Sequence, residues 1–199
     1  MSDFFIFLQL GFAHITDPNG YDHILFVVAL CAVYSVRQWR QVLVLITAFT
    51  VGHSVTLALA MLQLVSVRTD VVELLIPITI LITAAANFFP TKQTANRPPP
   101  VTNYRYALAF GFGLIHGLGF SNYLRSLLGR EADILAPLLA FNIGLELGQL
   151  LIVSAIVGVS FIAVDWAHVA RRDWIVAVSV LVLFMAVSLI LTSDLVAAK

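Results

Sequence analysis

Apolar residues fill six long stretches of the chain, and charged residues gather in the short segments between them. The stretches cover residues 21–36, 42–64, 71–89, 106–123, 134–164 and 174–192. Most approach or exceed the ~20 residues that a helix needs to cross a bilayer. A backbone surrounded by lipid must satisfy its own hydrogen bonds, which helices do internally. The pattern predicts an all-α, polytopic transmembrane helical bundle with six clear spans.

A seventh apolar run, residues 4–13, is only about half the length of a full span. It lacks the basic flank and the small-residue cleavage site of a secretory signal, so we assign it to the mature fold. It is expected to be a short or tilted helix, or to lie in the interface. The chain is therefore predicted to be a single integral membrane domain over residues 1–199, with six or seven spans. Residues 90–105, which include three consecutive prolines, are expected to form an extended loop.

The composition supports a membrane location and narrows the chemistry. Hydrophobic residues make up 60% of the chain and charged residues only 11%, against about 25% charged residues in soluble domains. The net charge is zero and there is no basic run, so no nucleic-acid partner is expected. Cys31 is the single cysteine, which excludes a thiolate metal cluster. Any metal ligands must come from nitrogen and oxygen.

The lysines and arginines are distributed unequally between the two faces. The loops at 37–40, 90–105 and 165–173 share one face and carry seven of them, and the other face carries the remaining four of 11. This bias favours the first face as cytoplasmic. We expect an integral protein of a bacterial inner membrane, whose less basic face is periplasmic.

Polar side chains interrupt the apolar stretches where a lipid-facing helix would have none. Glu146 lies roughly 18 Å from the start of its stretch, near the bilayer centre, where a lone carboxylate is costly. It should therefore face the bundle interior, protonated or paired with a cation. Asn142 and Gln149 share its helical face. A structural glutamate with one interhelical hydrogen bond is the alternative.

Histidines interrupt two other stretches. His53 lies near the middle of its span, beside Thr47, Thr50 and Ser54, and hydrogen bonding between helices is the alternative role for this polar face. His116 lies in a glycine-rich run where small residues four apart allow two helices to approach closely. The remaining histidines of interest, His14 and His23, flank Asp22 across a Pro-Asn-Gly turn, although Asp22 could simply cap a helix.

Topology brings these polar residues toward one face of the membrane. Near the less basic face lie Asp22, His23, Glu73, His116 and Asn142, with His53 and Glu146 deeper. We interpret the set as a funnel that opens on the periplasmic face and ends near mid-membrane. The predicted metal ligands are His14, Asp22, His23, His53, His116 and Glu146. The predicted supporting or pathway residues are Ser54, Asn142, Gln149, Glu73 and Asn87; Asn87 could equally bond a neighbouring helix.

Five segments resemble the HupE/UreJ family in sequence and order. They are residues 11–14 (GFAH), 20–26 (GYDHILF), 48–54 (AFTVGHS), 113–120 (GLIHGLGF) and 141–149 (FNIGLELGQ). That family is associated with hydrogenase and urease gene clusters and is regarded as a nickel or cobalt permease. The resemblance implies a role in metal supply, with metalloenzyme maturation machinery as a partner. The interval from His14 to Asp22 is longer than is typical of nickel permeases, which favours His23 over His14 as a ligand.

Three functions fit these residues. In the leading one, the protein transports a divalent transition metal ion (Ni²⁺, Co²⁺, Zn²⁺ or Fe²⁺), whose ligands would be neutral imidazole and carboxylate. His14, Asp22 and His23 would capture the ion and pass it inward. In the second, His23, His53 and His116 hold zinc, and Glu146 or Asp22 activates a water for intramembrane hydrolysis. The third is a metal-binding accessory or sensor protein.

Overall fold

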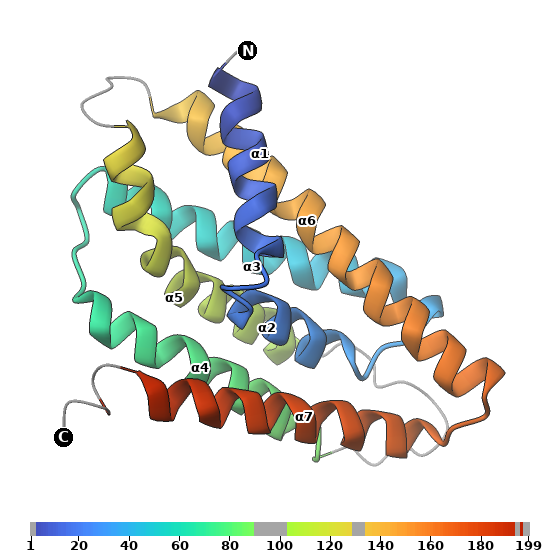
Figure 1. The fold of residues 1–199 in the computed structure, drawn as a ribbon. Helices are drawn as coiled ribbons and strands as arrows, with labels where there is room; N and C mark the ends of the chain where they lie inside the picture. The colour runs from blue at the N-terminus through green and yellow to red at the C-terminus, as the bar shows by residue number, and fades with distance from the viewer. Residues whose placement is uncertain (1–2, 90–102, 129–133, 194–195, 197–199) are drawn as a thin grey trace.

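The computed structural model describes residues 3–89, 103–128, 134–193 and 196 (Figure 1). Over these residues the chain is helical with connecting turns, and the all-α prediction is confirmed. The elements are α1 (Asp3–Thr16), α2 (Asp22–Cys31), η1 (Val36–Gln38), α3 (Trp39–Met61), α4 (Thr69–Ala86), α5 (Asn103–Leu128), α6 (Leu135–Phe161), η2 (Ile162–Trp166) and α7 (Arg171–Thr192). Of the predicted extended loop at 90–105, residues 90–102 lie outside the described residues, and residues 103–105 instead form the start of α5.

Four helical segments are long and apolar enough to cross a membrane. They are Val36–Met61, Thr69–Ala86, Leu135–Trp166 and Arg171–Thr192. The expected span over residues 21–36 is instead the ten-residue helix α2, about 15 Å long and too short to cross alone. The chain leaves the helix after Cys31 although the residues that follow are apolar and buried. The prediction of six or seven spans is therefore supported only for these four segments.

Glycines allow two pairs of parallel helices to pack with their backbones in contact. A Cβ atom at Gly113 would overlap the Phe49 carbonyl, which places α5 directly against α3. A Cβ atom at Gly11 or Gly144 would likewise overlap the backbone of the opposite helix in the α1–α6 pair. Small residues allow the same close approach between helices in membranes. The expected close packing around His116 is confirmed.

The two short helices α1 and α2 meet in the middle of the molecule. Figure 1 shows α1 running from the N-terminus to the centre, where a turn at residues 17–21 leads into α2. Helices α4 and α7 lie side by side along one flank of α2 (Figure 1). Seven of the ten residues of α2 are buried. Residues 17–20 of the turn are exposed, whereas His23, just after it, is buried.

Arginines mark one end of the bundle. Arg171 at the start of α7 donates to the carbonyl of Val33, 3.1 Å away, just beyond α2. The guanidinium of Arg105, near the start of α5, lies 5.8 Å from the ring centre of Tyr34. Arg37 and Arg40 flank the start of α3. We call this the arginine end; α3 and α5 run away from it, and α2 runs toward it.

Candidate metal centre

Four histidines from four helices meet inside the bundle. His14 lies near the end of α1, His23 at the start of α2, His53 in α3 and His116 in α5. One ligand atom from each of His14, His23 and His53 lies within 4.8 Å of the others. The ring centre of His116 is 5.0 Å from that of His23. His23, His53 and His116 are each at most 4% exposed.

Two of these rings are oriented by hydrogen bonds through Nδ1. The Nδ1 of His23 lies 2.8 Å from Oδ1 of Asp22, and the Nδ1 of His116 lies 2.8 Å from the carbonyl oxygen of Phe112. A carbonyl or a carboxylate oxygen only accepts, so each Nδ1 carries the proton. The Nε2 atom of each neutral ring is then left with a free lone pair. Metal-bound histidines are held in the same way.

The remaining ring nitrogens lack partners although they are buried. Within the described part of the chain, no hydrogen-bond partner reaches Nε2 of His14, His23 or His116, or either ring nitrogen of His53. Leaving a buried polar atom unsatisfied typically costs about 1–3 kcal/mol. Several such atoms converging on one point are therefore best explained by a ligand. Nitrogen donors of this kind suit a divalent transition metal ion.

Asp22 contacts the His23 ring and also satisfies a backbone N–H in the first turn of α2. Its Oδ1 accepts from both the backbone N–H of His23, at 2.8 Å, and the imidazole ring. The residue before it, Tyr21, is the N-cap and makes no side-chain cap. The carboxylate therefore fixes the ring and places a negative charge beside the cluster, which would offset part of the charge of a bound cation.

An open cavity adjoins the cluster on the side away from the arginine end. Its volume is about 570 Å³, and it is lined by Leu10, Ala13, His14, Thr16, Asp17, Pro18, Phe120 and Tyr123. His14 belongs to both the cavity and the cluster. Its ring lies 3.9 Å from that of Phe120, centre to centre. An ion in this cavity would reach His14 first; we call the cavity the vestibule.

The polar face of α6 contacts α3 instead of entering the histidine cluster. Glu146 is partly buried and accepts a 2.7 Å hydrogen bond from Thr47. Gln149 is fully buried and accepts a 2.8 Å hydrogen bond from Thr50. These bonds agree with the alternative role given above for this face, in which Glu146 makes a hydrogen bond between helices. Asn142 donates to the carbonyl of Leu138 in its own helix, at 2.8 Å.

Within the described part of the chain, none of the other three predicted supporting residues makes a hydrogen bond to a cluster histidine. Ser54 donates to the carbonyl of Thr50, one turn back in α3. Glu73 is exposed at the start of α4. Asn87 is buried and donates to the Ala29 carbonyl, at 2.9 Å, and to the Ser179 hydroxyl, at 3.2 Å. Asn87 was expected either to line the pathway or to bond a neighbouring helix, and these contacts agree with the second role.

Sequence reasoning missed the aromatic surroundings of the histidines. The ring of His53 stacks on Phe141, with centres 6.2 Å apart, and Phe49 lies 5.2 Å from His116. Phe26, Phe49 and Phe112 each stand three or four residues from a histidine in the chain. That spacing could have indicated that each phenylalanine lies beside a histidine, since residues three or four apart share one helical face.

Apolar helices around a buried set of imidazoles define an integral membrane protein with an internal polar site. The sequence model described as "HupE / UreJ protein" matches residues 1–193. The chain therefore belongs to the HupE/UreJ family, which relates it to transition metals such as nickel or cobalt. No curated protein and no solved structure matches it.

Proposed function

We propose that this protein binds a divalent transition metal ion at the four-histidine cluster and carries it across the membrane. The supporting observation is the convergence of buried, unpartnered ring nitrogens from four helices. Imidazole nitrogen suits Ni²⁺, Co²⁺, Zn²⁺ and Fe²⁺. We favour Ni²⁺ or Co²⁺ because of the family to which the chain belongs.

The spacing of the ligand atoms is compatible with closure around an ion. Metal–imidazole bonds are about 2.0–2.1 Å long, which places tetrahedral ligands about 3.4 Å apart. The three candidate atoms lie within 4.8 Å of one another, so each ring needs to move by only about 1 Å. His14, His23 and His53 would form the first set of ligands, and His116 would complete it.

The arrangement of α1 and α2 also favours transport. Neither helix is long enough to cross a bilayer alone, yet a turn at residues 17–21 joins α1 directly to the largely buried α2. We propose that they form one interrupted span. Transporters commonly place ion sites where such a helix breaks, because the carbonyl end of a helix attracts cations. His14 lies at the carbonyl end of α1.

The carboxylates do not favour the hydrolase. A zinc hydrolase needs a carboxylate that can take a proton from metal-bound water. Asp22 is already bonded to His23, and Glu146 is bonded to Thr47 on the face of α6 that contacts α3. The vestibule instead supplies an approach for an ion.

Metal uptake into proteoliposomes tests this function. Liposomes containing the purified protein and an enclosed Co²⁺-quenched dye would be given external Co²⁺. We expect saturable quenching that is lost in His53→Asn and retained in His168→Asn, because His168 is an exposed loop residue. Equal quenching by the two variants would contradict the proposal. Co²⁺ binding without quenching would favour the accessory or sensor role, and release of a cleaved product would favour the hydrolase.

A further inference from the structure

Three phenylalanines form a layer one helical turn from three of the histidines. Phe26 follows His23 by three residues, Phe49 precedes His53 by four, and Phe112 precedes His116 by four. Helix α2 runs toward the arginine end, whereas α3 and α5 run away from it. All three rings therefore lie on the arginine side of the histidine cluster, about 5 Å along the helix axes.

The three rings are in contact through Phe26, which touches both of the others. Phe26 stacks on Phe49 with centres 4.9 Å apart, and its edge-to-face contact with Phe112 spans 5.8 Å. Phe26 and Phe49 are at most 1% exposed. The ring of His116 is 5.4 Å from Phe26 and 5.2 Å from Phe49, which places it directly against this layer.

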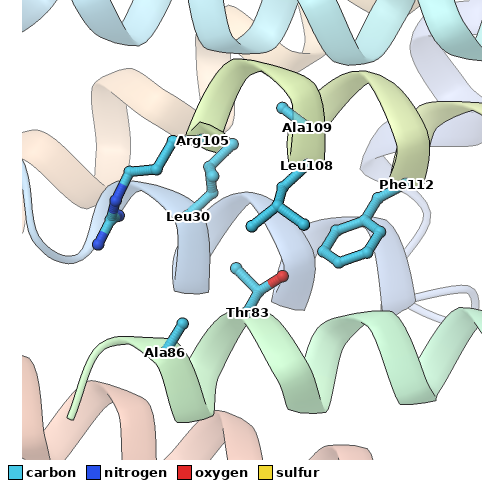
Figure 2. Close-up of a pocket in the computed structure, with 7 residues that line it drawn as sticks. All are labelled: Leu30, Thr83, Ala86, Arg105, Leu108, Ala109 and Phe112. Atoms are coloured by element: carbon cyan, nitrogen blue, oxygen red, sulfur yellow. The ribbon is translucent and has the colours of Figure 1, made fainter. Parts of the chain in front are cut away.

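A small cavity lies on the other side of Phe112. Figure 2 shows Phe112 and Leu30 facing it from α5 and α2, with Thr83 facing it from α4. Its volume is about 20 Å³, enough for about one water molecule. Arg105 lines the cavity as well, one turn of α5 nearer to the arginine end than Leu108. The histidines, the phenylalanines, the cavity and Arg105 thus follow one another in that order.

We propose that Phe26, Phe49 and Phe112 are the closed inner gate of the metal route and that the small cavity is its constricted exit. This inference rests on the proposed transport function. Apolar constrictions close ion pathways by excluding water, and a divalent ion does not leave its ligands for a dry, uncharged layer. The positive charge of Arg105 adds to the barrier. The vestibule is open on the opposite side, so the structure corresponds to a state closed at the arginine end.

The variant Phe112→Ala tests the gate because it removes one ring of the layer and leaves the histidines in place. The matched control is Phe110→Ala in the same helix, since Phe110 is 37% exposed on the outer surface. Both full-length variants would be reconstituted in liposomes. The leak of Co²⁺ and of protons would then be recorded with the concentration gradient of the leaking ion as the sole driving force. Phe112→Ala should raise the leak at least about tenfold, equivalent to lowering the barrier by about 1.4 kcal/mol. Phe110→Ala should match the wild type.

Co²⁺ binding in detergent separates failure of the gate from failure of the proposed function. Phe112→Ala should bind Co²⁺ with the wild-type visible spectrum, and an unchanged leak with intact binding would overturn the gate alone. Absence of Co²⁺ binding by the wild type would overturn both proposals. Phe112→Leu keeps an apolar side chain and is expected to fold and to leak less than Phe112→Ala but more than the wild type. If only the leucine variant can be reconstituted, a wild-type leak in it overturns the gate.

Discussion

Removing the Asp22 carboxylate is the perturbation that most directly probes how the cluster is organised. Asp22 accepts from His23 Nδ1 at 2.8 Å and so leaves Nε2 free as a donor to metal. Asp22→Asn keeps an oxygen that can accept this hydrogen bond but removes the charge. Asp22→Ala removes both, so that the ring of His23 loses its orienting partner.

The expected magnitude follows from this geometry. Loss of an outer partner of a metal-bound histidine typically lowers metal affinity 10- to 100-fold, which is about 1.4–2.7 kcal/mol. We expect Asp22→Asn near the lower end, because the hydrogen bond survives, and Asp22→Ala near the upper end. The difference between the two variants measures the part due to the hydrogen bond.

Titration with Co²⁺ in detergent, followed by visible absorption or calorimetry, would give the dissociation constants. Asp17→Asn is the matched control, because Asp17 lines the vestibule and its carboxylate accepts from the backbone of Asn19. We expect this control to stay within about threefold of the wild type. Wild-type affinity in Asp22→Ala, in a folded protein, would refute the assignment of His23 as an oriented ligand.

Three further predictions concern packing, polar contacts and pH. Gly113→Ala should lower stability in detergent by about 1–3 kcal/mol, because its Cβ overlaps the Phe49 carbonyl, whereas Gly111→Ala, with open space around it, should not; equal unfolding temperatures would contradict the close α3–α5 packing. Thr50→Val should cost about 1–2 kcal/mol in the same assay, because Gln149 stays buried without its donor, and an unchanged unfolding temperature would count against this bond. Apparent Co²⁺ affinity should fall as the pH is lowered, because protons compete with the metal for imidazole nitrogen; an affinity that stays constant down to the pH at which the protein unfolds would contradict histidine ligation.

Hydropathy predicted the helices well but not the lengths of all of them. The stretch at 174–192 became Arg171–Thr192, and the stretch at 71–89 became Thr69–Ala86. The stretch at 21–36 did not form a full-length helix: residues 32–34 lie outside regular helix and are buried in the protein. Hydropathy does not distinguish a residue buried in lipid from one buried in protein.

The histidines could be predicted as a group because a polar imidazole inside an apolar membrane helix is costly and usually marks a functional site. The surroundings of Glu146 could not be predicted in the same way. Its spacing from Gln149 shows that they share a face, but spacing along one helix does not show which neighbour that face meets. Gly144 and Gly148 decide this, since they turn toward α1, and the polar face then contacts Thr47 and Thr50 of α3.

X-ray absorption spectroscopy on the purified protein loaded with Co²⁺ or Ni²⁺ tests the central claim most directly. The cluster of His14, His23, His53 and His116 predicts three or four imidazole nitrogens at about 2.0–2.1 Å from the metal, with the outer-shell scattering of the ring atoms. His53→Asn should reduce the imidazole count by one. A shell made only of oxygen atoms, unchanged in His53→Asn, would contradict the account.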